Sequence, residues 1–105
     1  MDGDDNRLRK IGCEGKNPGQ FGAAAGVSYV NINEILIADQ GNHRMQHINI
    51  QTGTVVKSFG KHGVGKGEFN NPVDVYFADE GRIVVTEWGN HRIQKENLTR
   101  YLMLV

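Results

Sequence analysis

Two stretches of this chain, ILIADQGNHRMQ at residues 35–46 and IVVTEWGNHRIQ at residues 83–94, share one pattern. Each begins with an apolar run, continues through an acidic residue and a Gly-Asn-His-Arg turn, and ends in an apolar residue followed by Gln. A His between Asn and Arg resembles a reactive site when it occurs once. Because this one recurs after 48 residues, it indicates a repeated piece of architecture.

The repeat extends well beyond these two stretches. A shift of 48 residues aligns the chain without a gap, and the substitutions between matching positions are conservative, such as Asp39 for Glu87. Identical pairs outside the two stretches include Gly12 and Gly60, Gly15 and Gly63, Gly19 and Gly67, Phe21 and Phe69, and Val27 and Val75. We therefore interpret the chain as a tandem repeat.

Each repeat has the pattern of short strands separated by turns, without a helix signal. Residues 73–77 alternate apolar and polar side chains, as a half-buried strand does. Residues 35–38 and 82–86 are continuous apolar and β-branched runs, which are typical of strands buried on both faces. Further strands are predicted around residues 45–48 and 55–59. Four antiparallel strands in one such period fit a blade of a β-propeller.

This combination resembles the NHL repeat. The pattern of that family has an apolar strand that ends in an acid, a turn with Asn-His-Arg, a strand that starts with an apolar residue and Gln, and a Phe-Gly before a glycine-rich loop. The matching acid and turn positions are Asp39, Asn42, His43, Arg44, Glu87, Asn90, His91 and Arg92. The resemblance covers residues 7–94 and implies an all-β fold, a partial β-propeller with about two four-stranded antiparallel blades.

The resemblance also divides the chain into parts. Residues 1–20 are expected to hold the last strand of a preceding blade, at residues 7–12, and the loop between blades. Residues 21–60 form the first repeat and residues 69–105 the second, whose last strand departs from the family pattern after residue 94. Because closed propellers need at least about four blades, we expect either a fragment or a homo-oligomer that completes the ring.

The Asn-His-Arg turn is interpreted as architecture. The acid can accept hydrogen bonds from turn N–H groups, and the Arg can pair with that acid or with backbone carbonyls of the adjoining blade. The alternative is a zinc site, since peptide-amidating lyases resemble this fold and carry zinc on histidines. No third ligand is evident beside His43 and His91, so we expect no metal, no cofactor and no catalytic residue.

A glycine-rich stretch at residues 60–66, GKHGVGK, matches most of a phosphate-binding loop. That motif requires Ser or Thr as the next residue and a helix behind it. Gly67 stands there instead, and the equivalent loop at residues 12–19 lacks the pattern. We therefore predict loops between blades and no nucleotide hydrolysis.

Composition narrows the compartment and the partner classes. Twelve basic and twelve acidic residues leave no net charge, which favours neither nucleic acid nor a membrane as partner. The single cysteine, Cys13, permits no intrachain disulfide and favours a reducing compartment. The acidic start lacks the apolar core of a signal peptide, and no apolar run approaches membrane-spanning length. The expected location is cytoplasmic.

One end of the propeller is the candidate binding face. In an up-and-down blade, the turn after the second strand and the loop after the fourth emerge at the same end. The residues expected to bind a partner there are Lys16, Lys61, His62, Lys66 and Trp88. Trp beside basic side chains can stack on single-stranded RNA or anchor a protein interface. Alternatively, Trp88 packs on the neighbouring blade and the lysines only keep the loops solvated.

The family resemblance implies a role for this face. NHL propellers often end tripartite-motif (TRIM-NHL) ubiquitin ligases, where they recruit RNA stem-loops or protein substrates for ubiquitination. A single cysteine cannot build the zinc-binding RING of such a ligase, so these residues are expected to form a non-catalytic binding module for protein or RNA. The alternatives are a fragment of a lyase-like zinc enzyme and an incomplete propeller without an independent function.

Overall fold

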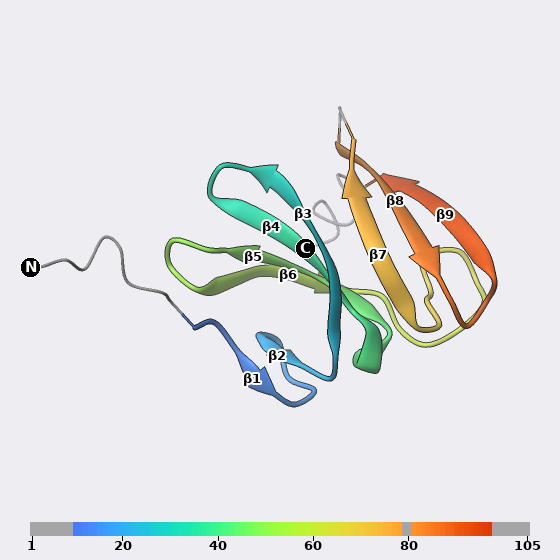
Figure 1. Cartoon of the computed structure of the whole chain (residues 1–105), viewed down its shortest axis with the longest axis horizontal. Helices are drawn as coiled ribbons and strands as arrows, with labels where there is room; N and C mark the ends of the chain where they lie inside the picture. Colours follow the sequence, from blue (N-terminus) through green and yellow to red (C-terminus); the bar gives the residue numbers. More distant parts are fainter. Residues whose placement is uncertain (1–9, 79–80, 98–105) are drawn as a thin grey trace, which may run out of the picture.

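The computed structural model describes residues 10–78 and 81–97. They form a two-stranded ladder, a four-stranded antiparallel sheet and a three-stranded antiparallel sheet (Figure 1). The predicted all-β fold, a partial β-propeller, is confirmed. A 3-10 turn, η2 (Gln40–Asn42), was not predicted; it is closed by His43, whose left-handed backbone lets its N–H bond to the carbonyl of Gln40. In the described part of the chain, no helix has the length and apolar character needed to span a membrane.

The four-stranded sheet is the first blade, and its strands follow one another in space as in sequence. The strands are β3 (Ala24–Asn31), β4 (Glu34–Asp39), β5 (Arg44–Asn49) and β6 (Thr54–Phe59). Their register pairs Ile35 with Ile48 and Asp39 with Arg44. The strands predicted around residues 35–38, 45–48 and 55–59 are thus confirmed.

The three-stranded sheet repeats this arrangement. Its strands are β7 (Pro72–Phe77), β8 (Arg82–Glu87) and β9 (Arg92–Asn97). Glu87 pairs with Arg92, as Asp39 pairs with Arg44 in the first blade. The departure from the family pattern after residue 94 does not end the third strand, which continues to Asn97. The fourth strand expected in this repeat falls on residues 98–105, outside the described residues.

The N-terminal part holds β1 (Cys13–Glu14) and β2 (Gln20–Phe21), which pair in parallel. The pairing of Glu14 with Phe21 corresponds to an isolated bridge between His62 and Phe69 before the second blade. The two glycine-rich loops therefore have the same fold. The strand expected at residues 7–12 lies mostly outside the described residues, and residues 10–12 are not in a strand.

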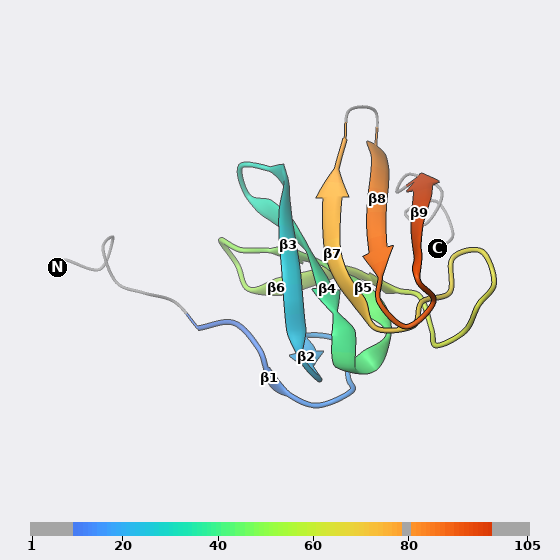
Figure 2. The same cartoon turned by 45° about the vertical axis from the view of Figure 1, so that its right-hand side comes forward.

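The two blades bury a shared apolar core between them. The first blade contributes Leu36, Ala38, Met45 and Phe59, and the second blade, with the loop before it, contributes Phe69, Val75, Ile83 and Val85. Alternation along each strand places these side chains on the facing sides of the two sheets. Figure 2 shows β3 and β7 side by side, where the Phe77 N–H donates to the Ser28 hydroxyl at 3.0 Å. This blade-to-blade packing holds the repeats together.

Candidate functional site

The carboxylate of Asp39 is the centre of the first Asn-His-Arg turn. Asp39 ends β4 and is fully buried. It accepts hydrogen bonds from Asn42 Nδ2 at 3.0 Å, from Arg44 Nε at 2.9 Å and from the Gly22 N–H at 2.9 Å, and Gln46 Nε2 lies 3.4 Å away. A buried anion is tolerated here because several donors satisfy it.

The same turn binds the loop that leads into the blade. Arg44 donates three hydrogen bonds, at 2.6–3.1 Å, to backbone carbonyls within residues 16–20. Asn42 donates to the carbonyl of Gly15 at 2.8 Å, and Gln46 both accepts from residue 19 and donates to residue 20. These side chains fasten the glycine-rich loop to the sheet. We call the set Asp39, Asn42, Arg44 and Gln46 the first clip.

The second repeat builds the same structure, which we call the second clip: Glu87, Asn90, Arg92 and Gln94. The Glu87 carboxylate accepts from Arg92 Nε at 2.7 Å and from Asn90 Nδ2 at 2.8 Å. Arg92 donates to three carbonyls within residues 64–68 at 2.6–3.0 Å. Sequence reasoning identified the acid, the Asn and the Arg of each clip; it noted the Gln in the recurring pattern but assigned it no role.

The histidine of each turn points away from its clip. His43 has a positive φ of 53°, and its Nδ1 accepts the Asn71 N–H at 3.0 Å, just before β7. Its ring centre lies 4.3 Å from that of His62 in the loop between the blades. Burial, together with the nearby His62, lowers the pKa of His43, which fits its role as an acceptor. The Asn and Arg thus reach back to the preceding loop, whereas the His reaches forward to the next blade.

His91 has the same backbone, with a φ of 49°, but a different environment. In the first repeat, His43 contacts the blade that follows it. Within residues 10–78 and 81–97, no blade follows the second repeat, so His91 has no such contact there. His91 is exposed, and its imidazole has no hydrogen-bond partner in that part of the chain. The two histidines are therefore not brought together. Among the residues that the structure describes, no three His, Cys, Asp or Glu side chains are grouped to hold a metal ion.

The loop that resembles a phosphate-binding loop uses its N–H groups internally. Gly63 donates to the Phe69 carbonyl, and Gly65 and Gly67 donate to the side chains of Glu68 and Gln94. A phosphate cradle needs such N–H groups free and a helix behind them. The chain continues here into β7, so the loop is a connection between blades.

The candidate binding residues lie in the first loop, in the loop between the two blades and in the turn after β8. Figure 1 shows the turn after β4, the turn after β8 and the loops between blades on one side of the molecule. Lys61 Nζ is 3.5 Å from Glu68, and His62 packs on His43. Lys16 is exposed in the first loop. Trp88, at the tip of the second turn, is 67% exposed and borders a surface hollow together with residues of the second blade.

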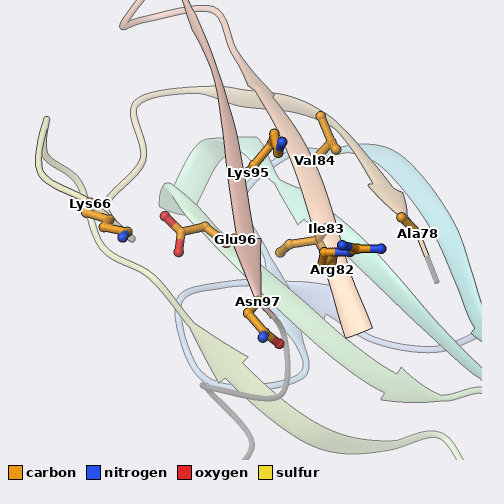
Figure 3. A pocket seen from close by; sticks show the side chains of 8 residues that line it. All are labelled: Lys66, Ala78, Arg82, Ile83, Val84, Lys95, Glu96 and Asn97. Atoms are coloured by element: carbon orange, nitrogen blue, oxygen red, sulfur yellow. The ribbon is translucent and has the colours of Figure 1, made fainter. Parts of the chain in front are cut away.

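Lys66 is separated from Trp88. It lines a hollow of about 450 Å³ together with Lys95 and Glu96 (Figure 3). This hollow lies near the start of β8 and the end of β9, away from the turn that carries Trp88. The arginines of the turns, Arg44 and Arg92, are occupied by the clips. The binding face expected from the sequence is thus less basic than a count of its side chains suggests.

The clip carboxylates have depressed pKa values. Burial alone would raise the pKa of Asp39, but hydrogen bonds from Asn42, Gly22 and Arg44 outweigh it and hold the pKa below its ordinary value of 3.8. Burial is likewise outweighed at Glu87, where hydrogen bonds led by that from Arg92 hold the pKa below 4.5. Both groups are therefore ionised in the folded protein at neutral pH.

Acid is expected to open the clips. Because the unfolded chain binds protons more readily at these two carboxylates, their contribution to stability is complete above pH 3.8 and 4.5 and is lost as the pH falls through the lower folded-state values. Urea unfolding midpoints should fall between about pH 6 and about pH 2.5. In a Glu87→Gln variant, with one titrating carboxylate fewer, the fall should be shallower. Identical pH profiles would contradict this assignment.

Comparison with known families bears on the second repeat. Residues 69–95 match the family model of the NHL repeat, a span that includes β7, β8, the second clip and most of β9. No curated protein matches the chain significantly. The match supports the NHL-repeat family, whose repeats form β-propeller modules that generally mediate protein interactions.

Proposed function

We propose that the chain is a non-catalytic binding module that recruits a protein partner through the end of the propeller where the turns and loops meet. Trp88 carries this proposal. It stands at the tip of the second turn, where the first repeat has Gln40, and 67% of it is exposed. A large aromatic side chain left uncovered on a soluble protein is a frequent anchor of protein interfaces.

The turn that carries Trp88 is held by hydrogen bonds, which favours recognition. The second clip fixes the ends of the turn through Glu87 and Arg92, and both loops between blades are bound at several carbonyls. Binding residues are commonly placed on loops that a rigid scaffold positions. A partner would therefore meet a surface that loses little conformational entropy on binding.

Charge supports a protein partner over RNA. Arg44 and Arg92 each make four internal hydrogen bonds with their five N–H donors, and Lys61 lies beside Glu68. Lys16 remains as an exposed cation in a loop that also holds the acidic Glu14. RNA binding depends on several phosphate contacts, whereas mixed charge around an aromatic centre is typical of protein interfaces.

Trp88→Ala is expected to weaken partner binding by about 30-fold, the effect of losing a hot spot. Proteins captured from a cell extract on the immobilised chain would be identified by mass spectrometry, and the affinity of the main partner then measured by calorimetry. Ile32→Ala is the matched control, since Ile32 is 85% exposed at the opposite end of the blade, between β3 and β4. Equal affinities for both variants would contradict the proposal.

RNA binding would give a different result. Affinity for single-stranded or stem-loop RNA would fall steeply with salt, and Lys61→Ala and Lys66→Ala would flatten the slope. That outcome would show that the partner is RNA and not protein, and the proposal of a binding module would stand.

Because the chain resembles the propellers of TRIM-NHL ubiquitin ligases, we extend the proposal to ubiquitination of the bound partner. The module would act as the substrate-recognition part of such a ligase, with ubiquitination carried out outside these residues. The exposed free thiol of Cys13 suits a reducing, cytoplasmic location. If the captured partner carries no ubiquitin in cells that contain the module, this extension is wrong and the binding function stands.

A further inference from the structure

The outer face of each blade corresponds to one of the two faces that pack together between the blades. We propose that copies of this chain associate head to tail, with the second blade of one copy packed on the first blade of the next. The head face is Phe21, Val27, Ile35 and Ile37. The tail face is Val84, Thr86 and Ile93, with Trp88 at its rim. This proposal concerns self-association and does not rest on the partner proposed above, although Trp88 borders both surfaces.

The internal interface defines what each face lacks. Ile93 in β9 is the repeat counterpart of Met45 in β5, which is 0% exposed because the second blade covers it, whereas Ile93 is 67% exposed. On the other half, Val75 in β7 is 4% exposed, whereas its counterpart Val27 in β3 is 59% exposed. Each exposed side chain thus occupies a position that the fold buries where a neighbouring blade is present.

The tail face has the shape and register of a blade surface that receives a neighbour. Thr86 pairs with Ile93 across β8 and β9, so the two side chains share one face, as Ala38 and Met45 do in the first blade. Val73, Thr86, Trp88 and Ile93 border a hollow of about 320 Å³ on it. In the first blade, Ala38 and Met45 are covered by a core that includes the ring of Phe69. Phe21 of a second copy is the equivalent ring.

The head face is already built for docking. The Gly15 N–H donates to the Phe21 carbonyl at 3.1 Å, and the Gly63 N–H donates to the Phe69 carbonyl at 3.0 Å. The first clip holds this loop in place even though no earlier blade is described. Phe21 is therefore presented like Phe69 before any contact forms, which lowers the entropic cost of association.

Charge favours a second copy as the occupant. Inside the molecule, His43 accepts the Asn71 N–H and faces His62. In the head-to-tail pair, the exposed His91 would take the position of His43, and Glu14, also exposed, would take the position of His62. A carboxylate beside an imidazole is attractive when the imidazole is protonated, so the intermolecular contact gains a complementary pair.

The geometry of the contact sets the size of the assembly. A head-to-tail contact is heterologous, so it either closes into a ring or continues as a filament. Propellers hold about four to eight blades. A ring of chains with about two blades each would contain about two to four copies.

Sedimentation and light scattering of the full chain over a range of concentrations test the proposal. The wild type should form an assembly that dissociates on dilution, and emission of Trp88, the only tryptophan, should shift to shorter wavelength on assembly because the counterpart position, Gln40, is half-buried. Ile93→Glu on the tail face and Val27→Glu on the head face should each weaken association on the order of 100-fold. Ile32→Glu, outside both faces, should leave it unchanged.

Mixing the two variants gives the decisive result. Ile93→Glu keeps an intact head face and Val27→Glu keeps an intact tail face, so an equimolar mixture should form a 1:1 heterodimer although neither variant associates alone. Restored association would also show that both variants are folded. A wild type that is monomeric at all concentrations, variants that still assemble singly, or a mixture that stays monomeric would overturn the proposal.

Discussion

An Asp39→Ala variant is expected to lose about 3–5 kcal/mol of unfolding free energy. The carboxylate is fully buried and is the anion that pairs with Arg44, whose side chain is only 11% exposed. Its removal leaves a nearly buried cation unpaired and deprives the Gly22 N–H of its acceptor. Urea unfolding followed by circular dichroism measures the loss.

Glu87→Ala is the matched control for this prediction. Glu87 has the same position and equivalent partners, but Arg92 is 30% exposed, so water can solvate the guanidinium after the carboxylate is removed. The expected loss is about 1–3 kcal/mol. Equal losses in the two variants would show that burial of the arginine does not set the cost.

Phe69→Ala is expected to cost about 3–5 kcal/mol by opening a cavity between the blades. Phe69 is 0% exposed and packs in the core that both blades share. For a domain of about this length, each kcal/mol lowers Tm by roughly 4–8 °C. A loss of about 3–5 kcal/mol should therefore lower the Tm of the Phe69→Ala variant by well over about 10 °C in a thermal scan.

Phe21→Ala provides the comparison within the same molecule. Phe21 is the repeat counterpart of Phe69 but is only half-buried, so its loss in the dissociated chain should be clearly smaller. A scan at low protein concentration, where copies are separated, isolates this difference. A Phe21→Ala variant as unstable as Phe69→Ala would mean that the first loop is packed as tightly as the second.

The strands could be predicted from the sequence because the repeat shows each pattern twice. Apolar runs at residues 35–38 and 82–86 and the turns after them fixed the blade order, and the acid and Arg at each turn marked the clips. The forward contact of His43 could not be predicted, since its partner is a backbone N–H at Asn71, a group that every residue but proline carries.

The burial of Glu96 and the exposure of Trp88 could not be predicted from the repeat pattern, because both depend on contacts in three dimensions. Glu96 replaces the apolar Ile48 of the first repeat, yet it is 6% exposed and lies within a regular strand, because the ladder with β8 and the second clip set the register of β9. The accessibility of Trp88 depends on what lies beyond the second blade. A sequence describes such a side chain but not its neighbours across an interface.

The clips also define which segment is the transferable module of this architecture. Asn42 and Arg44 bind the loop that precedes their own sheet, so a unit that starts at a strand would separate every clip from the carbonyls it binds. A unit that starts at Gly12 and ends at Phe59 keeps all of these bonds and leaves His43 for the unit that follows. Each added copy of that segment would bring its own complete clip and would place one more backbone N–H within reach of the preceding histidine, as Asn71 does for His43.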